Sequence, residues 1–335
     1  MGKLDAAGAK EKLDDLLEHV GKLRQSISQV IVGHNEVVDG VITCMLAGSH
    51  VLLEGVPGLG KTMLMRTLSE AVDLPFSRIQ FTPDLMPADI IGTTVVEETS
   101  TGGQRFEFKK GPIFAPLVLA DEINRATPKT QSALLEAMQE HRVTVGGTTH
   151  ELGQPYFVIA TQNPLEMEGT YPLPEAQLDR FFFKLKVPFP SREQLHEIIN
   201  RTTFASAPRA EKVLSAADVS RLSLTVRQVP VAEHVQDYVV RLLRATHPDL
   251  DGATEQVKRY VATGGSPRGA QAMLLAAKIR ALMAGRIAAS IDDVRAVAPA
   301  ALRHRILLNF EGEAESITTD AVICELIEQL AEAAS

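Results

Sequence analysis

This chain of 335 residues is 45% hydrophobic and 23% charged, a composition typical of globular proteins that fold in water. No run of residues has the length of a membrane span, and the N-terminus lacks a signal-peptide pattern. The net charge of −8 argues against broad attraction to nucleic acid, and Cys44 and Cys324 are too few cysteines for a disulfide framework. We therefore expect a cytoplasmic protein with one large and one smaller domain.

The chain begins with an expected helix, which is followed by a strand and a second helix. Apolar residues recur at helical spacing from Leu13 to Val30 and predict an amphipathic helix. The apolar run Ser49–Leu53 then ends at a glycine-rich segment. After that segment, Met63–Val72 contains strong helix formers and ends before Pro75.

The glycine-rich segment is a complete phosphate-binding loop of the pattern G-x-x-x-x-G-K-S/T. Its backbone N–H groups and the positive end of the next helix attract phosphate oxygens. Lys61 would reach the β and γ phosphates, and the Thr62 hydroxyl would bind Mg²⁺. The strand before it and the helix after it favour a nucleotide site over a simple glycine turn. The loop comprises Gly55, Val56, Pro57, Gly58, Leu59, Gly60, Lys61 and Thr62.

Four further apolar runs and one intervening helix complete the expected first domain. Strands that alternate with helices predict a parallel sheet of five strands with helices on both faces. Catalytic residues in such sheets lie at the carboxyl ends of the strands. The runs are Arg78–Phe81, Pro116–Ala120, Tyr156–Ala160 and Phe182–Val187, and the helix is Pro128–His141.

Two segments interrupt this alternation and are expected to form β-hairpins. Thr93–Glu97 and Arg105–Phe108 flank one turn, and Val143–Val145 and Thr149–Leu152 flank another at Gly146 and Gly147. They could be edge strands of the main sheet. We favour projecting insertions, because neither segment has the continuous apolar character of a buried strand.

The α/β region is expected to end at Pro188–Ser191, after which the sequence is almost entirely helical. We therefore divide the chain near residue 190. Residues 1–190 would form the nucleotide-binding core, and residues 191–335 would form a smaller all-α domain.

Two adjacent acids end the apolar run Leu117–Ala120. At a strand end beside a phosphate loop, Asp121 can hold Mg²⁺ through its water shell, and Glu122 can polarise an attacking water. An exposed acidic helix start is the alternative. The phosphate loop upstream favours the metal and base roles.

Three more polar residues are candidates for the same site. Asn163 follows the next strand and could orient water against the γ-phosphate, although an Asn-Pro pair is also a common turn. Arg180 precedes the last strand and could stabilise the negative charge of a phosphoryl transition state, or it could form a salt bridge to Asp179 or Glu175.

The third candidate is Arg268, which follows an expected helix start. Ser266 is suited to the N-cap position and Pro267 to the first turn. Arg268 would then project toward a nucleotide held between the two domains. A purely structural role is the alternative.

Together these motifs resemble those of the AAA+ ATPases, and more narrowly those of the MoxR family. The resemblance runs from about residue 10 to the C-terminus. The AAA+ motifs are Gly55–Thr62, Leu117–Glu122, Thr161–Pro164, Leu178–Phe181 and Ser266–Arg268. Those closer to MoxR are Lys110–Phe114, Asp121–Ala126, Glu175–Phe181 and Leu302–Ile306.

The resemblance implies an α/β core, a helical lid and ATP bound with Mg²⁺ at the junctions of a ring, usually a hexamer. It makes Asp121 and Glu122 the Walker B pair and Asn163 the sensor 1 residue. Arg180 becomes an arginine finger presented to the neighbouring subunit, and Arg268 the sensor 2 residue of the lid.

Three further features follow from the same resemblance. Ile31–His34, which includes Val32 and Gly33, is similar to the stretch that packs near adenine. The two hairpins match the insertions of the clade that contains magnesium chelatase and the MCM helicases. Gly269 departs from the family, which usually has alanine after the sensor 2 arginine, and we expect it to loosen the start of the lid helix.

The function expected from this resemblance is an ATP-driven chaperone that remodels client complexes, commonly with a partner that carries a von Willebrand factor A domain. An MCM-like DNA motor is the alternative, but the second hairpin has Arg142 at its base and no Lys or Arg at its tip. A nucleotide-dependent switch or scaffold with little turnover is a further alternative. A GTPase is disfavoured because no guanine-reading Asn-Lys-x-Asp motif is present.

Overall fold

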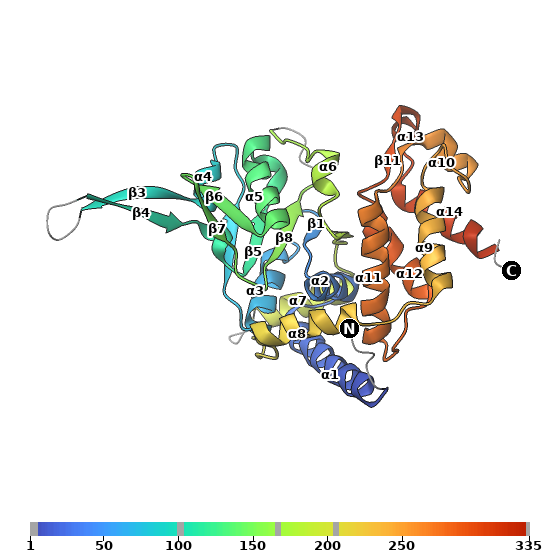
Figure 1. The fold of residues 1–335 in the computed structure, drawn as a ribbon, viewed down its shortest axis with the longest axis horizontal. Helices are drawn as coiled ribbons and strands as arrows, with labels where there is room; N and C mark the ends of the chain where they lie inside the picture. Colours follow the sequence, from blue (N-terminus) through green and yellow to red (C-terminus); the bar gives the residue numbers. More distant parts are fainter. Residues whose placement is uncertain (1–5, 99–103, 165–168, 204–207, 333–335) are drawn as a thin grey trace.

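The computed structural model describes residues 6–98, 104–164, 169–203 and 208–332. An α/β core carries a long projecting hairpin on one side, and a group of helices lies on the other side (Figure 1). Within the described residues, no helix is both long and apolar enough to cross a membrane.

The core is built on one parallel sheet of five strands in the order β2-β5-β8-β1-β9, which confirms the expected fold. Its central strands are continuous apolar runs because both faces of the sheet are covered. The strands are β1 (Val51–Glu54), β2 (Phe76–Gln80), β5 (Leu117–Asp121), β8 (Phe157–Gln162) and β9 (Phe183–Lys186).

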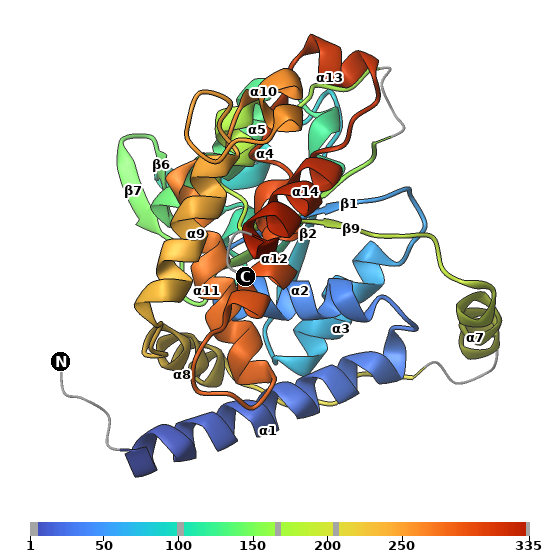
Figure 2. The same ribbon diagram turned by 90° about the vertical axis from the view of Figure 1, so that its right-hand side faces the viewer.

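Alternate residues of the central strands enter two separate hydrophobic cores. Val51 and Leu53 pack into one core, while Leu52 packs into the other. The first core also receives α1 (Ala6–Val30), α2 (Asn35–Leu46) and α3 (Lys61–Ala71). The second receives α4 (Pro87–Ile91) and α5 (Pro128–Glu140). The long helix α1 runs along the base of the molecule (Figure 2).

The two hairpins are insertions rather than edge strands, because each forms a two-stranded sheet of its own. The first consists of β3 (Gly92–Glu98) and β4 (Gln104–Lys110) and extends far from the core (Figure 1). The second consists of β6 (Arg142–Val145) and β7 (Thr148–Glu151). Phe108 of the first stacks on His150 of the second, with ring centroids 4.2 Å apart.

The segment after β9 is helical, as expected, with one small addition. A short antiparallel pair joins β10 (Val261–Thr263) to β11 (Leu307–Leu308). In Figure 2, helix α7 lies well away from helices α9 to α14. The helices are α7 (Arg192–Thr203), α8 (Ala216–Arg227), α9 (Glu233–Ala245), α10 (Glu255–Tyr260), α11 (Pro267–Met283), α12 (Ile291–Leu302), α13 (Phe310–Ala314) and α14 (Thr319–Glu332).

Candidate functional site

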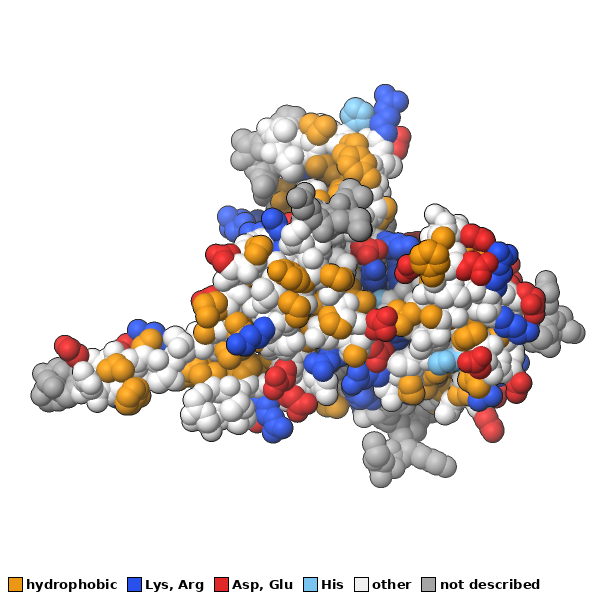
Figure 3. All heavy atoms as spheres, turned by 90° about the horizontal axis from the view of Figure 1, so that it is seen from above, with side chains coloured by type: hydrophobic (Ala, Val, Ile, Leu, Met, Phe, Trp, Pro, Cys, Tyr) orange, Lys and Arg blue, Asp and Glu red, His pale blue; other side chains and the backbone are white. Residues whose placement is uncertain are grey.

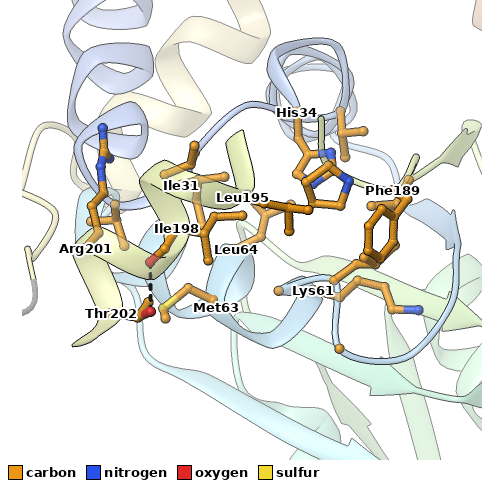
Figure 4. Close-up of a pocket in the computed structure, with 18 of the residues that line it drawn as sticks. Ile31, His34, Lys61, Met63, Leu64, Phe189, Leu195, Ile198, Arg201 and Thr202 are labelled. Carbon is orange, nitrogen blue, oxygen red and sulfur yellow. Dashed lines mark hydrogen bonds between the residues drawn. The ribbon is translucent and has the colours of Figure 1, made fainter. Parts of the chain in front are cut away.

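The phosphate-binding loop connects the carboxyl end of β1 to the first turn of α3, as the sequence predicts. Gly58 and Gly60 have φ values of 84° and 77°, a left-handed conformation that favours glycine. The loop forms one wall of a cavity of about 340 Å³ (Figure 4). The other walls are mostly apolar and come from the α1–α2 connection, the segment after β9, and α7. They include Ile31, Val32, His34, Phe189, Leu195 and Ile198.

Apolar walls beside a phosphate loop suit the base of a nucleotide. Val32 lines the cavity, and Gly33, with φ of 69°, connects it to His34, which also lines the cavity. Burial lowers the pKa of His34, so this imidazole is neutral at pH 7. The stretch expected near adenine therefore lies at the cavity wall.

Lys61 is the first residue of α3, and its ammonium group lies against the loop. The Nζ atom donates a hydrogen bond to the carbonyl oxygen of Gly55 at 2.6 Å. Burial lowers the pKa of Lys61, while the negative charges of Asp121 and Glu122 act in the opposite direction. The next residue, Thr62, is exposed.

Asp121 ends β5, and hydrogen bonds from two neighbouring strands fix its carboxylate. The Thr161 hydroxyl on β8 donates to Oδ1 at 2.7 Å. Arg78 on β2 donates to Oδ2 from Nη2 at 2.7 Å and from Nε at 3.1 Å. This buried carboxylate is therefore held at the same edge of the sheet as the loop.

Glu122 follows Asp121 in a left-handed conformation, with φ of 56° and ψ of 50°. Such a backbone costs a glutamate about 1–3 kcal/mol and is found at functional sites. Its N–H donates to the Thr161 hydroxyl at 2.8 Å, so one threonine organises both acids. The Glu122 carboxylate accepts hydrogen bonds from Gln80 at 2.8 Å and Arg125 at 3.0 Å.

Asn163 lies one residue beyond β8 and is buried. In the sheet, β8 pairs with β5 on one side and with β1 on the other. Asn163 therefore follows the strand that separates the two acids from the phosphate loop.

Arg180 and Arg268 lie together but away from the loop. Both line a second cavity of about 580 Å³, and none of the described residues lines both cavities. Arg180 donates from Nη1 to the carbonyl oxygen of Leu135 at 2.8 Å, and Arg268 donates to Asp179 at 3.3 Å. This cavity also holds the side chains of Arg227, Lys278 and Arg305.

The two cavities lie at opposite edges of the sheet. Ser49 and Phe182, which precede β1 and β9, line the second cavity. Leu53 and Val187, at the carboxyl ends of the same strands, line the loop cavity. The four residues of β9 span about 13 Å between these edges. The structure thus brings Arg268 to Arg180 and not to the loop of its own chain.

Comparison with known proteins identifies the family. The family described as "ATPase family associated with various cellular activities (AAA)" matches residues 50–183, and an AAA lid domain matches residues 253–326. The chaperone MoxR1 of Mycobacterium tuberculosis is 44% identical over 91% of this chain and 80% of its own length. This chain belongs to the MoxR family of AAA+ ATPases.

Two further relatives cover nearly all of the chain. The protein YeaC of Bacillus subtilis is 42% identical over 94% of this chain and 95% of its own length. A crystal structure of an ATPase candidate from Cytophaga hutchinsonii superposes with a TM-score of 0.90 at 39% identity, covering 96% of this chain and 97% of that one. The family and fold expected from the motifs are therefore confirmed.

As a MoxR-family AAA+ protein, the chain is an ATPase, and ATP is its substrate. The sequence did not reveal three polar residues that surround the acids. They lie on β2 and β8, the two strands that flank β5 in the sheet, and are Arg78, Gln80 and Thr161. Only the register, which pairs Gln80 with Asp121, shows that these side chains meet at one point.

Proposed function

We propose that this MoxR-family protein hydrolyses Mg-ATP at the subunit interfaces of a ring, most simply a hexamer, and uses the cycle to remodel client protein complexes. The observation that carries this proposal is the separation of Arg180 and Arg268 from the loop cavity of their own chain. An arginine finger must contact the phosphoryl group, so a second subunit has to supply it.

The residues at the carboxyl edge of the sheet have the chemistry to bind and activate the nucleotide. Lys61 binds the β and γ phosphates. The Thr62 hydroxyl and the Asp121 carboxylate are the hard oxygen donors that suit Mg²⁺. Both Asp121 oxygens already accept hydrogen bonds, which fits contact through a metal-bound water. The bound ion would neutralise phosphate charge.

Water activation is assigned to the residues beside this carboxylate. Glu122 polarises the attacking water and accepts its proton, while Asn163 orients it. Gln80 and Arg125 hold the Glu122 carboxylate at the sheet edge. Glu122 is therefore placed by its neighbours before any nucleotide arrives.

The cavity at the opposite edge supplies the second half of the site. Arg180, Arg227, Arg268 and Lys278 line it, and Asp179 is the only acid among the lining residues that the structure describes. Such an excess of positive charge favours the phosphoryl transition state of an adjoining subunit. Arg180 acts as the finger, and Arg268 acts beside it from the same subunit.

The long hairpin has the surface expected of a client contact. Val96 and Phe106 are direct cross-strand partners, and 51% and 76% of their respective surfaces are exposed. Figure 3 shows hydrophobic side chains along this projection. The related MoxR1 is named a chaperone, which supports client remodelling as the work performed. The proposal also divides the chain into a core of residues 1–190 and a lid of residues 191–335. It further includes a cytoplasmic location and a partner that carries a von Willebrand factor A domain.

A DNA motor is the second candidate, and the short hairpin disfavours it. Its turn carries Gly146 and Gly147, and Arg142 at its base pairs with Glu140 at 3.5 Å. Without exposed cations at the tip, the hairpin has little to attract phosphates. Strong stimulation of the ATPase by DNA, together with salt-sensitive DNA binding, would reverse this preference.

The proposal is tested by separating nucleotide binding from hydrolysis. Arg180→Ala should keep the wild-type dissociation constant for ATP and lose about 10³-fold or more in kcat, because a finger acts only in the transition state. Lys61→Ala should lose ATP binding. Ring assembly is measured in both variants by light scattering. Equal loss of ATP binding in the two variants, with assembly intact, would contradict the composite site.

A further inference from the structure

Three consecutive residues of the lid hold the segment that carries Arg180. They are Arg303, His304 and Arg305, which follow α12 and belong to the MoxR-like motif Leu302–Ile306. Arg303 donates from Nη1 to the carbonyl oxygen of Lys184 at 3.0 Å. His304 contacts the carbonyl oxygen of Phe181 through Nε2 at 3.0 Å. The lid therefore binds the backbone on the C-terminal side of Arg180.

Arg305 binds the backbone on both sides of Arg180. Its Nη2 donates to the carbonyl oxygens of Asp179 at 3.0 Å and Phe181 at 2.7 Å. Its Nη1 donates to the carbonyl oxygen of Phe182 at 3.2 Å and to that of Ala301, and its Nε donates to Asp179 Oδ1 at 2.8 Å. These bonds engage all five N–H donors of the guanidinium.

Asp179 connects this guanidinium to the other arginine of the cavity. Its Oδ1 also accepts a hydrogen bond from the Ser266 hydroxyl at 2.6 Å, and its Oδ2 accepts one from Arg268 at 3.3 Å. Ser266 is the N-cap residue of α11, as predicted, but its hydroxyl bonds to the core instead of its own helix. Asp179 directly precedes Arg180. It thus connects the start of α11 and the end of α12 to the segment that carries Arg180.

The burial of this cluster makes it rigid. The Arg305 side chain is 2% exposed, so removing its ion-pair partner would leave an uncompensated charge. Burial lowers the pKa of His304 well below its ordinary value, with the Arg305 charge acting in the same direction, so the imidazole is neutral and donates from Nε2. A rigid cluster transmits a displacement of the lid to the Arg180 backbone.

We propose that Arg305 is a positioning residue for Arg180, so that the lid of each subunit sets the finger that it presents to its neighbour. The inference rests on the proposed role of Arg180 at the adjoining site. In this proposal, the lid and the segment that carries Arg180 move together as one rigid body. Nucleotide-driven movement of a lid in one subunit would then change catalysis in the next.

The test is a double-mutant cycle between Arg180→Ala and Arg305→Lys, read as kcat for ATP hydrolysis. Lysine keeps the charge but has three donors and no planar fork, so it cannot hold the same carbonyl groups. We expect Arg305→Lys to lower kcat about tenfold to a hundredfold, as misplacement of a catalytic group does. The ATP dissociation constant and the assembly state should stay unchanged.

The cycle separates a positioning role from a merely structural one. If Arg305 acts through Arg180, the double variant has the kcat of Arg180→Ala, because the finger it would place is gone. A further loss in the double variant equal to that of Arg305→Lys alone would overturn the proposal. So would an unchanged kcat in Arg305→Lys.

Two controls keep the outcome interpretable. Arg295→Lys changes an arginine of α12 that contacts Asp292 and Tyr238 within the lid, and it should leave kcat unchanged. If Arg305→Lys does not fold, Arg303→Lys takes its place in the same cycle with a several-fold expected effect. Wild-type kcat in Arg180→Ala would instead overturn the proposed function. Loss in Arg180→Ala with no loss in the lid variants would overturn the positioning role alone.

Discussion

The two edges of the sheet carry the two half-sites that we propose, and these are built differently. At the carboxyl edge, the core strands place Lys61, Asp121 and Glu122, with α7 closing the cavity wall. At the amino edge, Arg180 and Arg268 come together only because the lid contacts Asp179. These charged residues of the first proposed half-site therefore all lie within the core, while the second depends on how core and lid sit together.

The largest expected effect comes from removing the base of the first half-site while ATP binding is kept. Glu122→Gln keeps the shape of the side chain and its place between Gln80 and Arg125 but removes the base. We expect kcat to fall by about 10²–10⁴-fold with ATP affinity retained. Single-turnover hydrolysis and equilibrium ATP binding measure the two quantities. An unchanged kcat would favour a low-turnover switch or scaffold over an enzyme with Glu122 as its base.

A smaller effect distinguishes the two half-sites directly. Arg268→Ala should lower kcat of the assembled protein by roughly 10²-fold, as loss of one transition-state donor does. The isolated subunit should bind ATP with unchanged affinity, because Arg268 does not line its loop cavity. The matched control is Arg280→Ala on the same helix, which removes a 3.5 Å contact with Asp293. Weaker ATP binding by isolated Arg268→Ala subunits would place this arginine at its own loop.

Acid should weaken the amino edge of the sheet, where His50 and His304 are buried. Burial lowers the pKa of His50 to about 4, and burial and the Arg305 charge hold that of His304 well below its ordinary value. Below the ordinary value of about 6.5 the unfolded chain binds protons that the folded chain does not. The contribution of His50 is therefore complete above pH 6.5 and is lost as the pH falls toward 4. His50 alone should lower the free energy of unfolding by about 1.4 kcal/mol per pH unit in this window, and His304 acts in the same direction.

Urea unfolding at pH 7 and pH 5 measures this slope. His50→Gln should flatten it, since it removes one of the two buried imidazoles. His234→Gln removes a histidine that is exposed on α9 and should leave the slope as it is. A slope that is equal in all three proteins would show that His50 contributes nothing.

The smallest effect concerns the glycine that departs from the family pattern. Gly269 is buried, and a Cβ there would lie 2.9 Å from Leu302 Cδ2 and 3.2 Å from Arg305 Cδ. Gly269→Ala gains about 1 kcal/mol of helix propensity but overpacks this contact by about 1–3 kcal/mol. We expect a net loss of up to about 2 kcal/mol by thermal unfolding and a small fall in kcat. A clear gain in stability would mean that the contact relaxes freely.

The parts of the site differ in how well the sequence alone predicts them. Gly55–Thr62 and Asp121–Glu122 were predictable because each is a short segment whose chemistry is local. The partners of the acids were not, because they depend on the order β2-β5-β8 and its register. The Arg305–Asp179 contact joins residues 126 positions apart, and no local pattern encodes it.

For Arg268, the sequence predicted the local structure but not the neighbours in the fold. Its place at the start of a helix was predictable from Ser266 and Pro267. Which edge of the sheet this helix faces depends on lid packing, and the structure places it beside Arg180. The sequence therefore predicted the set of residues better than their division between the two edges of the sheet.

The long hairpin has a mechanical consequence. Its strands have seven residues each, so it extends about 24 Å from its base. That base is closely packed, because a Cβ on Gly92 would lie 2.2 Å from the carbonyl oxygen of Lys109, and Phe108 stacks on the second hairpin. A rotation of the core by about 10° would carry the far end of such a lever through about 4 Å. Small rotations of the core thus become much larger displacements at the far end of the hairpin.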